Sequence, residues 1–215
     1  MRWLIPGLLA ATLLGSIGDA EAQDTPPEKL PIGRFVADAR VAFPKFKDDP
    51  AIASGIGGTV PNLPGRAFGL VAGAHWYPLR LGKVTFGVGG EVMAARRGRT
   101  LDTGTEDDPA QTTVNSRFSA LSPQISLNFG ARDGWSYISG GIGWASFTAE
   151  RADAPLPDPE SASKTINYGG GARWFIKPHL AFSFDVRFYA ISPSVSLPSS
   201  PRTTLLVIGA GISLK

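Results

Sequence analysis

The stretch that decides the fold is Leu180–Tyr189, which reads LAFSFDVRFY. Every second residue from Leu180 onward is apolar, whereas Ser183, Asp185 and Arg187 lie between them. Successive side chains of an extended chain point to opposite faces, so this period of two predicts a β-strand with one apolar and one more polar face.

The same alternation continues in both directions from this stretch. It predicts eight strands in all, and Pro123 inside the fourth predicts a β-bulge there, because proline cannot donate to the ladder of hydrogen bonds. The predicted strands lie near residues 34–46, 66–77, 83–96, 116–129, 135–147, 164–176, 180–191 and 203–214.

The connections between these strands alternate in length. Tight turns are expected at 78–82, 130–134 and 177–179, and longer connections at 47–65, 97–115, 148–163 and 192–202. Outer-membrane barrels have short periplasmic turns and longer extracellular loops. The predicted fold class is therefore all-β, an eight-stranded antiparallel up-and-down transmembrane β-barrel.

The direction in which the apolar face points separates a membrane barrel from a soluble one. A lipocalin-like barrel would turn this face inward, and that reading stays open as an alternative. Two levels of aromatic residues favour lipid outside, because aromatic girdles mark the two membrane interfaces. The predicted girdles are Phe35, Trp76, Phe129, Trp135 and Trp174 near the short turns, and Phe43, Phe68, Trp144, Tyr168 and Phe188 near the long loops.

The N-terminus has the features of a secretory signal. Arg2 precedes a short apolar run, and Ala20-Glu21-Ala22 fits a small-residue cleavage site, so residues 1–22 are expected to be removed. Residues 23–32 are expected to form a periplasmic leader and 33–215 the barrel domain. The expected location is the outer membrane of a bacterium, reached through the cleaved signal.

Three segments carry a family resemblance: the glycine-rich Tyr137–Trp144, the run Tyr168–His179, and Leu180–Tyr189 after it. On these segments the chain resembles the outer-membrane β-barrel domain family, the small eight-stranded group of OmpA-like and opacity-type barrels. The resemblance covers essentially all of 33–214. It implies the barrel-assembly machinery as a partner, although family members often end in an aromatic residue and this chain ends in Leu214-Lys215.

The charged residues on the more polar face are expected to lie in the barrel interior. Five of them fall near mid-depth, and charges in a tight interior must pair because isolated ones cost several kcal/mol each. We predict a structural polar network that fills the lumen, with a narrow ion or small-solute channel as the alternative. The five residues are Asp38, Arg40, Glu91, Asp185 and Arg187.

Arg96, Arg97 and Arg99 lie where the third strand leaves the membrane, and we predict that they contact lipopolysaccharide phosphates, since guanidinium groups bind phosphate in a bidentate fork. The remaining partners are expected to be outer-membrane lipids, with the protein a monomer.

The amino-acid composition argues against several kinds of catalytic and binding site. Cysteine is absent, histidine occurs twice and the formal net charge is only +3, so we predict no catalytic residues, metal or cofactor and no nucleic-acid partner. The expected role is structural or surface-interacting, through the long loops.

Overall fold

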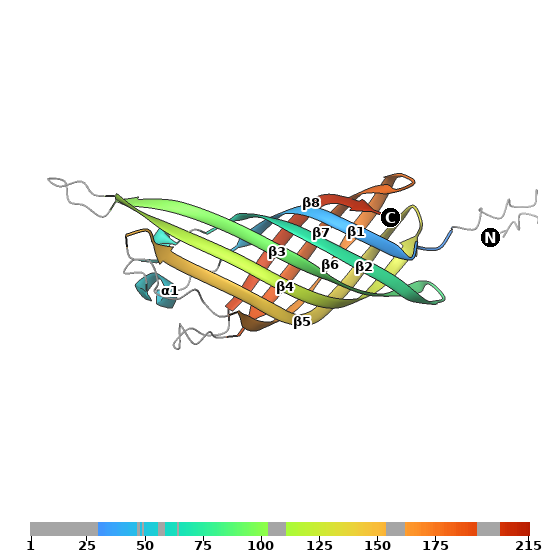
Figure 1. The fold of residues 1–215 in the computed structure, drawn as a ribbon, viewed down its shortest axis with the longest axis horizontal. Coiled ribbons are helices and arrows are strands. Elements are labelled where there is room, and N and C mark those ends of the chain that lie inside the picture. The colour runs from blue at the N-terminus through green and yellow to red at the C-terminus, as the bar shows by residue number, and fades with distance from the viewer. Residues whose placement is uncertain are drawn as a thin grey trace, which may run out of the picture.

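The computed structural model describes residues 30–46, 48, 50–55, 59–63, 65–102, 111–153, 162–192 and 203–215. Eight antiparallel strands, each paired with its sequence neighbours, form a closed barrel in which β1 also pairs with β8 (Figure 1). This confirms the predicted fold class. The strands are β1 (Phe35–Lys45), β2 (Phe68–Leu81), β3 (Val84–Asp102), β4 (Gln111–Ala131), β5 (Gly134–Arg151), β6 (Ser163–Lys177), β7 (Leu180–Ile191) and β8 (Thr203–Leu214).

Both ends of the described chain lie at one end of the barrel, together with the three tight turns (Figure 1). We call this the short-turn end and the opposite one the long-loop end. The turn between β2 and β3 contains Gly82 with a φ of 58°, a left-handed conformation that glycine adopts without steric cost. Two short helical segments, α1 (Pro50–Gly55) and η1 (Val60–Asn62), follow β1. Among the described residues, no helix has the length and apolar character needed to cross a membrane.

The register corrects the prediction of a bulge at Pro123. Strands β3 and β4 pair without a shift from Val84 opposite Phe129 to Asp102 opposite Gln111. The shifts lie elsewhere, between Trp76 and Leu79 and near the end of β6. The pairing of β4 with β5 is interrupted at Pro123, but the register is the same on both sides, so no residue is inserted there. Gly141 of β5 lies against the Pro123 carbonyl at this point and has no Cβ to collide with it.

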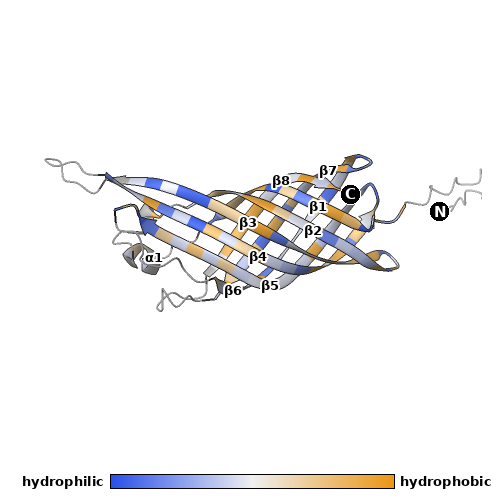
Figure 2. Ribbon diagram, in the orientation of Figure 1, coloured by the Kyte–Doolittle hydropathy of each residue, from blue (hydrophilic) through white to orange (hydrophobic). Residues whose placement is uncertain are grey.

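The strands reach further toward the long-loop end than predicted. Much of the loop expected at 97–115 belongs to β3 and β4, and β5 continues to Arg151. Figure 2 shows hydrophilic residues at these strand ends. These strand ends are mostly polar, and Val114 is the one buried apolar residue among 111–115, so the apolar alternation that marks a strand is missing from the sequence. The β-branched Thr112, Thr113 and Val114 nevertheless favour an extended chain.

The outer surface carries a broad belt of exposed apolar side chains. The side chains of Ile125, Ile142 and Ile176 are 70%, 69% and 70% exposed. A belt of this kind on a closed barrel is typical of a lipid-facing wall. Trp135 does not belong to it: its side chain is 3% exposed and points inward, because it shares parity with Tyr137 rather than with Ile138. The other aromatic residues of the two predicted girdles lie on the outer face.

Candidate functional site

The centre of the lumen holds three carboxylates and three guanidinium groups. The structure brings together all five polar residues singled out in the sequence and adds Arg173, which reaches in from β6. Each of the six is at most 5% exposed. Opposite charges therefore balance inside the barrel wall, which is the condition for burying them there. The six are Asp38, Glu91, Asp185, Arg40, Arg173 and Arg187.

Asp38 forms the most complete of the ion pairs. Both of its carboxylate oxygens accept from Arg173, over 3.0 Å from Nε to Oδ1 and 2.6 Å from Nη2 to Oδ2. The Ser213 hydroxyl also donates to this carboxylate, and Nδ1 of His75 lies 3.7 Å from Oδ2. The pair joins β1 to β6 across the barrel, and the planar fork of arginine matches the two oxygens.

Glu91 is shared by two arginines. Arg40 donates from Nη2 to one carboxylate oxygen, and Nε of Arg187 lies 3.3 Å from the other. The side-chain amide of Gln124 also donates to Oε2, over 3.1 Å. This carboxylate therefore holds β1, β4 and β7 against β3.

Tyr137 links the two halves of the network, and sequence reasoning missed this role. Its hydroxyl donates to Asp185 over 2.8 Å and accepts from Arg40 over 2.9 Å. The guanidinium carbon of Arg173 lies 4.3 Å from its ring centroid, a cation–π contact. The signal was present in the alternation of β5, where Trp135, Tyr137 and Ser139 all face inward opposite the exposed Ile138.

Apolar layers lie on both sides of this network. Toward the long-loop end the lumen is filled by a cluster that includes Val71, Met93, Phe118 and Tyr189. Toward the short-turn end Val36, Tyr77 and Trp135 pack together with Ile32. The predicted polar network therefore fills only the middle layer of the lumen. Small-to-medium apolar residues on both faces of a strand, as in Val71 between Leu70 and Ala72, are the sequence signal of the apolar layer.

The short-turn end is covered by residues from both ends of the described chain. Ile32 is 9% exposed, and the carbonyl of Leu30 accepts from the Arg132 amide over 2.8 Å. The end of the predicted leader therefore packs against the barrel, while 23–29 lie outside the described residues. Nζ of Lys215 lies 3.5 Å from the Phe175 ring centroid. Burial, followed by the nearby Arg132, lowers the pKa of this lysine.

The long-loop end is partly covered by the segment after β1. Ala53 of α1 and Leu63 beyond η1 are buried against Phe147 and Ala149 of β5. Beside them Arg151 donates to both carboxylate oxygens of Asp153, and this hydrogen bonding lowers the pKa of the Asp153 carboxyl.

The three arginines predicted to contact lipopolysaccharide do not form one patch. Arg96 lies on the outer face of β3, in register with Arg117 of β4. Arg97 and Arg99 alternate with it and share the inner face, where Nη1 of Arg99 lies 3.4 Å from the Leu63 carbonyl oxygen to which it donates. Only Arg96 faces the surface that a membrane lipid would reach, so the contact remains a prediction for that residue.

The two histidines have different surroundings. His75 is buried beside Asp38, and His179 lies in the turn between β6 and β7, where Nδ1 is 2.9 Å from the Lys215 carbonyl oxygen. In the part of the chain that the structure describes, no three acidic, histidine or cysteine side chains gather in a way that suits a metal ion.

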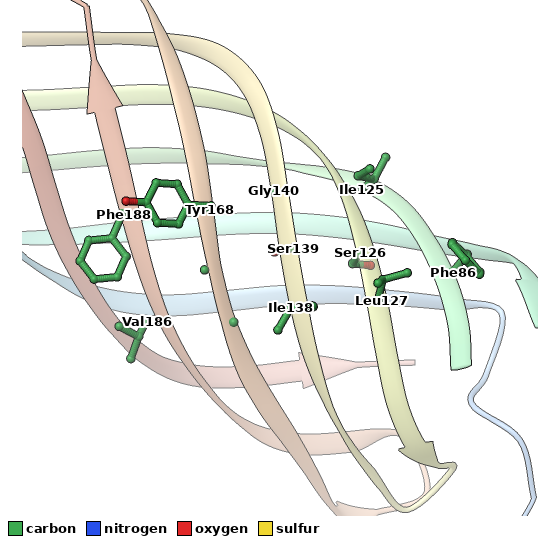
Figure 3. Close-up of a pocket in the computed structure, with 12 residues that line it drawn as sticks. Phe86, Ile125, Ser126, Leu127, Ile138, Ser139, Gly140, Tyr168, Val186 and Phe188 are labelled. Carbon is green, nitrogen blue, oxygen red and sulfur yellow. The ribbon is translucent and has the colours of Figure 1, made fainter. Parts of the chain in front are cut away.

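The outer wall itself is hollowed at its glycine-rich strands. A groove of about 770 Å³ lies over β3 to β7, where Gly140 and Gly170 contribute no side chains. Its upper wall is the stacked pair Tyr168 and Phe188, with ring centroids 5.4 Å apart, and Ile138 lies across from them (Figure 3). The lining is apolar, so the groove suits hydrocarbon.

Comparison with known proteins supports the fold. No family model matches the chain, and no curated protein matches it. Among solved structures, Neisserial surface protein A is 13% identical with a TM-score of 0.51, over 84% of this chain and 96% of that one. The attachment invasion locus protein Ail of Yersinia pestis is 12% identical with a TM-score of 0.45, over 84% and 97%. At 13% identity, the likeness to Neisserial surface protein A shows a shared fold and nothing more. The chain therefore has the fold of small eight-stranded outer-membrane barrels.

Proposed function

We propose that this protein is an outer-membrane barrel with a closed lumen, and that its role is structural or surface-interacting rather than catalytic or conducting. The single observation that carries the proposal is the lumen network: three acidic and three arginine side chains, nearly fully buried, span the interior between two apolar layers. Eight strands leave an interior just wide enough for side chains to fill it.

The exposed belt supports the location. Its large apolar side chains would be costly against water but not against lipid. With this placement the short turns face the periplasm, and the long-loop end faces the cell exterior. There β3, β4 and β5 extend beyond their neighbours and present polar faces on which a partner could bind. Lipopolysaccharide is the expected lipid around the wall.

Two measurements test the proposal. In cell fractionation, the protein should appear with the outer membrane and migrate differently on a detergent gel before and after boiling, because a folded barrel resists detergent. In planar bilayers the refolded protein should show no stable conductance. Steady single-channel currents would overturn the closed lumen in favour of a narrow channel. A soluble periplasmic protein without a heat-dependent shift would instead indicate a lipocalin-like binder.

A further inference from the structure

Two arginines face each other on the outer wall just above the apolar belt. Arg96 of β3 and Arg117 of β4 are directly opposite in register, on the face that also carries Phe68. Like charges placed directly opposite on neighbouring strands destabilise a sheet. An anion bound between the two arginines would offset this repulsion.

The described part of the protein supplies little negative charge to this pair. The Arg117 side chain is 71% exposed, and among the described residues it forms one ion pair, with Glu150, over 3.9 Å from Nη2 to Oε1. For Arg96, no ion pair is recorded among the described residues. One distant carboxylate against two guanidinium groups leaves net positive charge at this position, and an exposed pair of this length contributes little.

A recess opens in the wall directly below the arginines. It has a volume of about 370 Å³ and lies where Ser119 and Ser146, which are opposite in register, replace larger side chains. The next pair down, Leu121 opposite Trp144, closes its lower side. Both of these are about half exposed, at 49% each. Positive charge above and apolar surface below match an amphiphile with an anionic head.

We propose that Arg96 and Arg117 bind a phosphate of lipopolysaccharide, whose adjoining lipid occupies the recess bounded by Leu121 and Trp144. The inference rests on the proposed outer-membrane location and replaces the patch of three arginines with one composed of residues from two strands. Guanidinium groups bind phosphate oxygens through paired, charge-assisted hydrogen bonds. Trp144 lies at the level where tryptophan favours the membrane interface.

Binding of purified lipid A by the refolded full-length protein in detergent micelles tests the site. The Arg96→Gln and Arg117→Gln variants should each bind about tenfold more weakly, because each loses one charge-assisted contact to the phosphate. The matched control is Arg97→Gln, which removes the same charge one residue away on the inner face. It should leave the dissociation constant within about twofold, which is within the range of weak exposed charges.

A second variant tests the recess without changing charge. Ser119→Phe should fill it and weaken lipid binding while leaving the arginines intact. Each variant is first checked for the heat-dependent gel shift, so that a misfolded protein is not scored as a binding defect. Removing the phosphates from lipid A should cost as much affinity as removing the arginines.

The outcomes separate this site from its rivals and from the proposed function. Equal loss in the Arg97→Gln control, or unchanged binding in the Arg96→Gln and Arg117→Gln proteins, would overturn the site. If millimolar inorganic phosphate competed as effectively as the lipid, the site would be one for a free anion instead. If lipid A binds as expected but the protein fractionates outside the outer membrane, the proposed location fails while the site stands.

Discussion

Arg173 and Asp38, separated by 135 positions in the sequence, meet as a bidentate ion pair inside the barrel. Both side chains are almost fully buried, and neither has bulk water to replace its partner. Removing one member of such a pair leaves an uncompensated charge, whereas replacing both can be nearly neutral.

We therefore expect Asp38→Leu and Arg173→Met each to lower the free energy of unfolding by about 3–5 kcal/mol. The double variant Asp38→Leu/Arg173→Met should recover much of that loss. Urea-induced unfolding in micelles, followed by tryptophan fluorescence, measures all three proteins. A double variant as unstable as the sum of the single ones would contradict the pairing.

Tyr137 should contribute through its hydroxyl rather than its ring. Tyr137→Phe removes one hydrogen bond to Asp185 and one from Arg40, both in a buried setting, and should cost about 1–3 kcal/mol. The control is Tyr168→Phe, which loses a hydroxyl on the exposed outer wall. The same unfolding titration should place this control within about 0.5 kcal/mol of the parent protein. Equal effects at the two positions would mean that the network does not depend on Tyr137.

The sequence predicted the architecture well because a closed barrel with an apolar outer belt imposes a strict period of two along each strand. The alternation in β7 follows directly from this rule. It fails beyond the apolar belt. There β3 and β4 are mostly polar on both faces, with Val114 the one buried apolar residue among 111–115, so 97–102 and 111–115 lacked the pattern although they are strands.

The candidate site was only partly predictable for a related reason. Parity identifies which charges face inward, and that was enough to select Asp38, Arg40, Glu91, Asp185 and Arg187. It does not show which strands lie opposite across the lumen, so the partner of Asp38 could not be assigned. We predicted Trp135 on the outer face because it lies near a strand end, where girdle residues are expected. That prediction was wrong, because Trp135 is two residues from Tyr137 and so points inward with it.

We expect Gly141 to be essential for the close approach of β5 to β4. A Cβ at this position would overlap the backbone carbonyl of Pro123, which cannot move away as a side chain could. Gly141→Ala should therefore destabilise the barrel by about 3 kcal/mol or prevent its assembly. The heat-dependent gel shift of protein refolded in detergent reports this. Gly98→Ala is the control, because its new Cβ would meet nothing closer than the Asn115 side chain at 3.4 Å. A normal shift for Gly141→Ala would show that the strands can separate at that point.

The identity of the outer face can be tested by placing a charge in the belt. Ile142 is 69% exposed in the middle of β5, so Ile142→Arg would put a guanidinium group into hydrocarbon if this wall faces lipid. We expect Ile142→Arg to lower the free energy of unfolding by about 2–4 kcal/mol in lipid vesicles. For Thr148→Arg, which lies on the same face of β5 nearer the long-loop end, we expect a loss of only about 0–1 kcal/mol. Urea-dependent unfolding in vesicles measures both variants. If Ile142→Arg were as stable as Thr148→Arg, the belt would be exposed to water and the barrel would be a soluble one, since the penalty depends on depth in the bilayer and not on the substitution itself.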